Sequence, residues 1–232
     1  MKLAIKQPYF LPYIGYWQAI KSVDLFVIYD NIQYIKKGWI NRNKMLMNSS
    51  DFLFSIPIKK DSDYKDIVAR EVSAMFDRKK NLSQIRTSYS KAPHFTKVYP
   101  TLESIFNYNE TNLFLYIYNS IKVLCDYLGI STKLIVSSQL NIDHTVLRKQ
   151  EKVLGICNFL NADTYYDSVG AQELYSKDVF LDKGIELKFL KSELFEYKQF
   201  NNDFIPWLSI IDVLMFNSVE KVNDMLDRYE LI

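Results

Sequence analysis

Two short segments near the start of the chain combine polar and aromatic side chains that could hold a diphosphate and a sugar or base. The first segment carries Gln7, Tyr9 and Tyr13. The second begins at Asp30 and is rich in amides and cations: Gln33, Lys36, Lys37, Trp39, Asn41, Arg42 and Asn43. Arginine and lysine neutralise phosphates, and tyrosine and tryptophan offer flat faces that stack on sugars and bases.

Asp30 has more than one possible role. As a general base it would have to lie within hydrogen-bond reach of the group that it deprotonates. It could also hold a ribose or sugar hydroxyl, or simply cap a turn, and Arg42 could form a purely local ion pair. The density of amides, cations and acid between Asp30 and Asn43 favours a binding segment.

Further candidate residues also have two interpretations each. A third polar segment follows a predicted strand and includes Asp167, Ser168 and Gln172. Asp167 and Ser168 could cap the next helix, or the amides at the start of that helix could receive an anion. Ser137-Ser138 has the same two interpretations. Asp212 lies in an apolar helical run, so it either faces solvent or turns into the cleft as a ligand group.

The familiar catalytic signatures are absent from the sequence. It has no GxGxxG, GxxxxGK[ST] or GxSxG pattern, and His94 and His144 have no obvious serine or cysteine partner in sequence. Cys125 and Cys157 lie in apolar helical patterns and lack the CxxC spacing of a zinc or redox site. We therefore expect buried, reduced thiols and no metal.

The composition is that of an ordinary soluble globular protein. Of 232 residues, 48% are hydrophobic and 24% are charged, so we expect residues 1–232 to form a single domain. A net charge of +2 is too small to indicate a nucleic acid or an anionic membrane as partner. The N-terminus lacks a secretory signal, and no segment has the roughly 20 apolar residues of a membrane span, which predicts a cytoplasmic protein.

The elements that must position the candidate residues begin with a βαβ unit. Leu3–Ile5 and Leu25–Tyr29 are apolar runs typical of strands buried in a parallel sheet, and Tyr13–Lys21 between them has helical spacing. Phe52–Ile58 and Ile67–Val72 are then predicted to form an antiparallel hairpin around a charged turn.

Helices and strands alternate through the middle of the chain. One helix is predicted from Leu113 to Leu128 with Gly129 as its C-terminal cap, and another has Asp143 as N-cap and Val146 on its apolar face. Three further strands are predicted, at Lys133–Val136, Thr164–Tyr166 and Ile185–Leu190.

The C-terminal part, Trp207–Asp227, is predicted to be helical with a break at Asn217-Ser218. The alternation favours an α/β fold with a doubly wound, mostly parallel sheet, a small antiparallel excursion and a helical C-terminal part. Ligands of open parallel sheets bind at the carboxyl ends of the strands. We therefore expect the segments that follow the first two strands to face one crevice.

Several motifs follow one another along the chain in an ordered combination. The run from Gln7 to Tyr16 has the pattern QPxxxPxxGY, and the run from Asp24 to Tyr34 follows it. The later motifs are Asn41-Arg42-Asn43, Tyr166-Asp167-Ser168 with Gly170, Gly184 to Phe189, and Pro206 to Asp212. This set resembles the WbqC-like family of bacterial polysaccharide loci, and the resemblance spans nearly the whole chain.

Two positions depart from the family pattern. Many relatives have histidine before the Gln-Pro pair, where this chain has Lys6, so a catalytic histidine is not carried over. Relatives often have two glycines near Gly170, and the second position here is Ala171. A left-handed backbone would be strained at an alanine, so we expect the backbone there to differ.

The resemblance implies a transferase of O-antigen or capsule biosynthesis, since some relatives are labelled glycine or aminoacyl transferases. The implied reaction moves an acyl or aminoacyl (glycyl-type) group from a donor to the amine of a nucleotide-activated amino sugar. On this hypothesis Asp30 is the base, and Gln7 and Asn41 are orienting groups. The remaining assignments are Arg42 with Lys36 or Lys37 to the phosphates, and Tyr9, Tyr13 or Trp39 to the base or sugar.

Two alternatives stay open. A non-catalytic protein of the same pathway would bind a sugar nucleotide or a partner enzyme without turnover. An ATP-dependent ligase would activate a carboxylate as an adenylate. The early strand, the loop with Gly15 and the following helix are loosely similar to nucleotide-binding α/β ligases of that kind.

Overall fold

A six-stranded sheet forms the centre of the computed structural model, which describes residues 1–142, 150–201 and 203–232. The strand order is β5-β2-β1-β6-β7-β8, and all but β8 run parallel. The strands are β1 (Lys2–Lys6), β2 (Leu25–Ile28), β5 (Lys133–Val136), β6 (Thr164–Ser168), β7 (Glu186–Ser192) and β8 (Tyr229–Leu231). The predicted α/β class with a mostly parallel sheet is confirmed.

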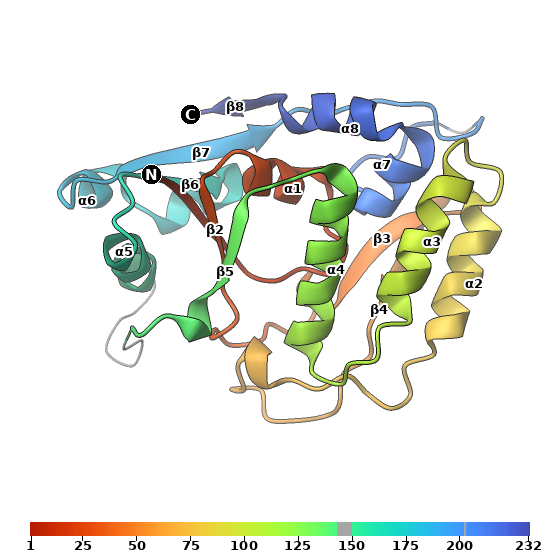
Figure 1. The fold of residues 1–232 in the computed structure, drawn as a ribbon, viewed down its shortest axis with the longest axis horizontal. Helices are drawn as coiled ribbons and strands as arrows, with labels where there is room; N and C mark the ends of the chain where they lie inside the picture. The colour runs from red at the N-terminus through yellow and green to blue at the C-terminus, as the bar shows by residue number, and fades with distance from the viewer. Residues whose placement is uncertain (143–149, 202) are drawn as a thin grey trace.

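Helices cover both faces of this sheet (Figure 1). On one face, α1 (Ile14–Lys21) and α8 (Val219–Leu226) belong to the larger hydrophobic core, together with α4 (Leu113–Leu128). On the other face, α5 (Gln150–Phe159) and α6 (Lys177–Leu181) contribute to the smaller core. Because both faces are covered, the central strands are apolar on both sides.

The winding of the sheet reverses between β1 and β6. From β1 the chain moves outward to β2 and β5 with α1 and α4 in the larger core, and from β6 it moves the other way to β7 with α6 in the smaller core. Such a reversal leaves a crevice at the carboxyl ends of the two central strands, because the next helices lie on opposite faces. The switch point, where the winding reverses, thus lies at Lys6 and Ser168, whereas the predicted crevice was between the segments that follow β1 and β2.

A separate antiparallel pair of strands lies between β2 and β5 in the chain. It joins β3 (Arg42–Met47) to β4 (Ser50–Ser55) through a turn in which Asn48 and Ser49 have φ angles of 50° and 61°. Two successive positive φ angles are typical of tight hairpin turns, because their twist matches that of the strands. The predicted antiparallel excursion is confirmed, although its strands differ from those expected.

The predicted hairpin between Phe52–Ile58 and Ile67–Val72 is wrong in its second strand. Ile67–Ala69 forms a 3-10 turn, η1, and β4 pairs with β3 instead. In β3 the buried side chains of Asn43 and Met45 alternate with half-exposed charged ones. No strand was predicted here, because the segment contains three polar residues in succession.

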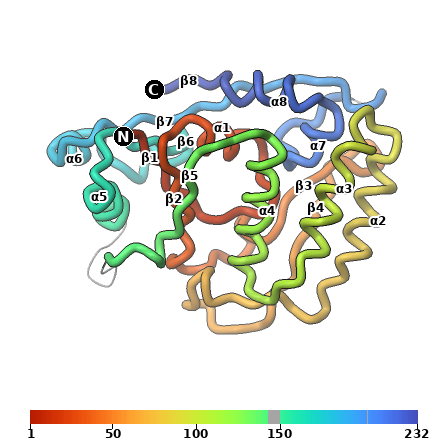
Figure 2. The backbone as a smooth tube through the Cα atoms, viewed as in Figure 1, coloured from red at the N-terminus to blue at the C-terminus, as the bar shows by residue number. Residues whose placement is uncertain are grey.

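Two helices that were not predicted lie at the end of the molecule away from α5 (Figure 2). They are α2 (Arg78–Tyr89) and α3 (Phe95–Phe106), which pack on each other, and α3 also packs on α4. α4 ends at Gly129, whose φ of 68° confirms the predicted left-handed cap.

The C-terminal helical part is broken as predicted. α7 (Ile210–Phe216) and α8 flank the break, and Ser218 caps α8 by accepting a hydrogen bond from the amide of Lys221. Ala171 lies in a 3-10 segment, η3 (Val169–Leu174), without a positive φ.

Three predicted features lie outside the described residues: Asp143 as an N-cap, His144 and Val146. Among the residues that are described, no helix is long and apolar enough to cross a membrane. The single domain over residues 1–232 stays a prediction.

Candidate functional site

A buried ion pair occupies the switch point of the sheet. The ammonium group of Lys6, the last residue of β1, contacts the carboxylate of Asp167 on β6 and donates to Ser168 Oγ at 3.2 Å. Asp167 also accepts hydrogen bonds from the Tyr165 hydroxyl and the Ser168 amide, both at 2.7 Å. The side chains of Lys6 and Asp167 are 15% and 7% exposed. Such a pair acts as a unit, because removal of one partner leaves the other charge buried and uncompensated.

One tyrosine of the loop from β1 to α1 and one of α1 bond to Gln7, the residue after Lys6. The Tyr16 hydroxyl donates to the Gln7 carbonyl oxygen at 3.0 Å, and the Tyr9 hydroxyl lies 3.4 Å from Gln7 Oε1. Burial raises the pKa of Tyr9, and the negative charge of Asp167 raises it further. Burial also raises the pKa of Tyr13, so both phenols stay protonated at neutral pH.

Tyr9 and Tyr13 line two neighbouring cavities. The larger has a volume of about 220 Å³, and its other lining residues are Pro12, Trp39, Asn43 and Trp207. The smaller has a volume of about 100 Å³, and its other lining residues are Lys6, Gly15, Tyr16, Ala19, Ser168 and Leu190. We call them the aromatic cavity and the polar cavity. A few polar groups beside an apolar concave surface are typical of small-molecule sites.

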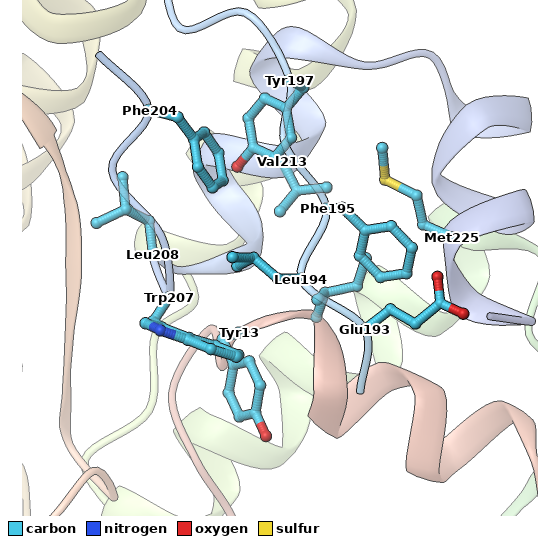
Figure 3. A pocket seen from close by; sticks show the side chains of 11 residues that line it. Tyr13, Glu193, Leu194, Phe195, Tyr197, Phe204, Trp207, Leu208, Val213 and Met225 are labelled. Carbon is cyan, nitrogen blue, oxygen red and sulfur yellow. The ribbon is translucent and has the colours of Figure 1, made fainter. Parts of the chain in front are cut away.

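Trp207 also borders a third, narrow pocket of about 30 Å³ (Figure 3). Its indole lies beside the Tyr13 ring, with a centroid distance of 6.0 Å and an angle of 73° between the planes. Tyr197 and Phe204 lie farther along the same pocket. A space of this size holds about one water molecule, so the pocket extends the groove without adding a ligand site.

Arg42 holds the turn that carries Trp39. Its Nε donates to the Gly38 carbonyl oxygen at 2.8 Å, and its Nη2 contacts the Lys37 carbonyl oxygen. The guanidinium carbon lies 5.6 Å from the centre of the Trp39 ring. Lys37 has a φ of 61°, an uncommon conformation for a residue with a side chain. Arg42 therefore fixes one wall of the aromatic cavity.

Hydrogen bonds also tie Asn43 and the segment after Trp207 to the loop after β1. Ser209 Oγ donates to the Leu11 carbonyl oxygen at 2.6 Å, and Asn43 Nδ2 donates to the same oxygen at 2.9 Å. Leu11 and Trp207 have φ angles of 47° and 61°. Non-glycine residues persist in this region when surrounding contacts fix them, and they cluster at functional sites.

Asp212 is buried in the protein interior, so the predicted alternative in which it faces solvent is wrong. Its carboxylate accepts from the hydroxyls of Tyr89 and Tyr197 at 2.9 and 2.8 Å and from Gln199 Nε2 at 2.6 Å. Burial raises its pKa despite these three donors. Gln199 also binds both backbone polar atoms of Ile205. Asp212 therefore supports the segment that leads to Trp207 and does not line the aromatic cavity.

Asp30, at the end of β2, is hydrogen-bonded to Ser137 and Ser138. Its carboxylate accepts from Ser137 Oγ at 2.9 Å, from the Ser138 amide at 2.9 Å and from Ser138 Oγ at 2.6 Å. The side chain has no exposed surface. These bonds join the ends of β2 and β5. The role of Asp30 as a base stays a prediction, and it would require the Ser137-Ser138 segment to open.

Other predicted site residues bond to neighbouring parts of the protein or lie on the surface. Asn41 accepts from the Tyr34 hydroxyl and donates to the Ile56 carbonyl oxygen, both at 2.7 Å. Gln33 donates to the Asp63 carbonyl oxygen at 3.0 Å, and Lys36 forms an ion pair of 2.5 Å with the Asp63 carboxylate. Lys37 and Gln172 are exposed.

The two cavities bring together six of the predicted residues: Tyr9, Tyr13, Trp39, Asn43, Ser168 and, behind Lys6, Asp167. Lys6 and Trp207 were not predicted as site residues. A signal existed for each, because Lys6 is a charged residue at the end of a buried strand and Trp207 is an aromatic residue within the Pro206 to Asp212 motif.

The cysteines do not provide a nucleophile. Cys125 and Cys157 are free and buried, and burial raises the pKa of each thiol to about 12, so neither forms a thiolate at neutral pH. Within residues 1–142, 150–201 and 203–232, no group of three or more His, Cys, Asp or Glu residues could hold a metal ion.

Comparison with known proteins agrees with the ordered motifs. The sequence profile of the WbqC-like protein family matches residues 7–224, which confirms the resemblance. The uncharacterized protein Rv1507c of Mycobacterium tuberculosis is 29% identical over 231 residues, which cover 98% of this chain and 98% of that protein. No solved structure matches the chain significantly.

Proposed function

This chain belongs to the WbqC-like protein family, and on that premise we propose that it is a transferase of surface-polysaccharide biosynthesis. Its substrate would be a nucleotide-linked amino sugar bound at the switch point of the sheet. The group transferred to the sugar amine would be an acyl or aminoacyl group from an activated donor.

The aromatic cavity is the observation that carries this proposal. Tyr9, Tyr13, Trp39 and Trp207 converge around a volume of about 220 Å³. Trp39 and Trp207 are 45% and 57% exposed, although large apolar side chains of this kind are normally covered. Flat rings with polar edges are suited to stacking on a sugar ring or a base. The cavity lies beside the switch point, where ligands of doubly wound sheets bind.

The reaction would join the sugar amine to an activated acyl group. The amine nitrogen attacks the acyl carbonyl carbon, a carbon–nitrogen bond forms, the bond to the leaving group breaks, and the amine releases a proton. A base within hydrogen-bond reach would have to take up that proton. Asp30 is the predicted base, and Asp167 is a carboxylate that contacts Lys6 in the lining of the polar cavity.

A thermal-shift screen with nucleotides, nucleotide-linked amino sugars, acyl-CoA compounds and ATP tests the substrate class. A ligand that binds only the folded state raises the melting temperature. We expect a shift with a nucleotide-linked amino sugar that is lost in Trp39→Ala and Trp207→Ala. Loss of a stacking ring should weaken binding by roughly tenfold to a hundredfold.

Phe159→Ala is the matched control, since Phe159 is 50% exposed on α5, on the opposite face of the sheet. It should leave the shift unchanged. A shift with ATP and a carboxylic acid alone would move the proposal to a ligase, and no shift with any sugar nucleotide would contradict it.

One observation favours binding without turnover as a second candidate function. The carboxylates of Asp30, Asp167 and Asp212 each accept three or more hydrogen bonds from the protein, which is unfavourable for a base. Mass spectrometry of the sugar after incubation with acyl donors separates the two candidates. An acylated sugar supports the transferase, and tight binding with an unchanged sugar supports the binding protein.

A further inference from the structure

We propose that the polar cavity is a subsite for an oxyanion group, a phosphate or a carboxylate, with Lys6 and Ser168 as its donors. This inference deepens the proposed function and rests on it for the flat part of the same ligand, which would lie in the aromatic cavity. It is carried by the lining of the cavity and by the way in which each polar group there is already bonded.

Lys6 presents a positive charge to the cavity from an almost buried position. Its side chain is 15% exposed and lines the volume of about 100 Å³. An ammonium group has three N–H donors. One contacts Asp167 and one is directed to Ser168 Oγ at 3.2 Å. The third is available to a ligand in the cavity.

Asp167 orients this ammonium group without facing the cavity itself. The carboxylate does not belong to the cavity lining, and it accepts from Lys6, from the Tyr165 hydroxyl and from the Ser168 amide. Ser168 does line the cavity, and its hydroxyl oxygen accepts from Lys6. The hydroxyl also lies 3.5 Å from Asp167 Oδ1, a long hydrogen bond that a closer oxyanion in the cavity would replace.

Two of the three tyrosines that line the polar cavity direct their hydroxyl hydrogens to the protein. The Tyr16 hydroxyl donates to the Gln7 carbonyl oxygen, and the Tyr9 hydroxyl lies toward Gln7 Oε1. None of the residues that line this cavity is an acid. Among the described residues that line the cavity, the formal charge is the positive charge of Lys6, so the ligand group that it suits is an anionic acceptor.

Of the other cations that were predicted to hold phosphates, Lys37 is exposed and lines neither cavity, and the remaining two have partners in the protein. Lys36 is paired with Asp63, and Arg42 binds the carbonyl oxygens of Lys37 and Gly38. Lys6 is thus the cation that lines a cavity at the switch point. Because Tyr9 and Tyr13 line both cavities, a ligand with its ring in the aromatic cavity can place an oxyanion beside Lys6.

Inorganic phosphate and acetate are the probes that test this subsite. Thermal shifts are measured at constant ionic strength for the wild type and for the double variant Lys6→Met/Asp167→Asn. The double change removes both charges, because Lys6→Met alone would leave Asp167 buried and unpaired. We expect the wild type to bind at least one probe, with roughly tenfold to a hundredfold weaker affinity in the double variant.

Lys21→Met is the matched control, since it also breaks a Lys–Asp pair, with Asp227 at 2.8 Å, at the far end of α1. It should keep the shift, and Lys6→Arg should keep it in part. A response to phosphate identifies a nucleotide phosphate as the natural group, and a response to acetate identifies a carboxylate of the acyl component. No shift with either probe, or an equal shift in the double variant, overturns the proposal.

The two proposals fail in different ways. If sugar nucleotides bind the wild type and the double variant equally well, the proposed function stands and the oxyanion subsite is wrong. If phosphate or acetate binds through Lys6 but no sugar nucleotide shifts the melting temperature, the subsite stands and the proposed substrate class is wrong.

Discussion

A Cβ atom added to Gly15 would lie 2.6 Å from the ring of Tyr13. The Tyr13 phenol therefore occupies its position between the two cavities because the residue two places later has no side chain. Gly15 itself lies in the first turn of α1 and does not have a positive φ. A glycine is thus needed here to leave room for the Tyr13 ring, and not to allow an unusual backbone conformation.

Gly15→Ala should displace the Tyr13 ring and weaken ligand binding, without loss of stability. Alanine is favoured over glycine within a helix by up to about 1 kcal/mol, and the clashing ring is at the mobile end of its side chain. Melting temperature and binding affinity should therefore move in opposite directions. Gly170→Ala is the control, because a Cβ there would meet no atom within 4 Å. Unchanged binding in Gly15→Ala would show that the Tyr13 position is not required.

Asp30→Asn should lower stability by about 1–3 kcal/mol, the usual cost of leaving buried donors unsatisfied. An asparagine retains one acceptor oxygen and turns its amide toward the donors of Ser137 and Ser138. Urea unfolding at neutral pH measures the effect. An unchanged free energy of unfolding combined with lost transferase activity would instead support Asp30 as the base.

Asp212 should make stability depend on acidic pH. Burial raises its pKa in the folded protein above the ordinary value of 3.8, so the folded state binds this proton more tightly than the unfolded chain does. The stabilisation is complete below 3.8 and is lost as the pH rises through the raised pKa. The advantage of the wild type over Asp212→Asn should therefore grow as the pH is lowered from neutrality. Parallel pH profiles of the two proteins would contradict the raised pKa.

Arg70 is a buried cation with unsatisfied donors. It is 1% exposed, and its Nε and Nη2 have no hydrogen-bond partner among the described residues. Its guanidinium carbon lies 4.9 Å from the centre of the Tyr34 ring, which offsets part of the cost of burial. Arg70→Met should raise the free energy of unfolding by about 1 kcal/mol, since an apolar side chain of similar length needs no partner. A decrease would reveal an anionic partner for Arg70.

The sequence predicts most of the sheet because its strands are apolar runs between clear breaks. Leu25–Ile28 and Lys133–Val136 were predicted within one residue of their ends. β3 was missed because a half-exposed strand can carry charged residues on one side, as Arg42 and Lys44 do. A hairpin partner also depends on the pairing of strands, which local patterns do not specify.

The site was harder to predict than the fold, because its residues meet only through strand order. Trp207 lies about 200 positions after Tyr9 and lines the same cavity. Asp30 was a reasonable candidate from its place after a strand, yet Ser137, 107 residues later, takes up its carboxylate. Sequence patterns proposed Tyr9, Tyr13 and Asp167, which lie at or next to the two cavities, but the reversal between β1 and β6 follows from the whole topology.

The most direct test of the aromatic cavity is tryptophan fluorescence during titration with a nucleotide-linked amino sugar. The chain has three tryptophans: Trp39 and Trp207 line the cavity, whereas Trp17 is fully buried. We predict a saturable change in emission that disappears in Trp39→Phe/Trp207→Phe, where Trp17 alone remains. The absence of any change in the wild type, or an equal change in the double variant, would contradict binding of the sugar nucleotide at the switch point.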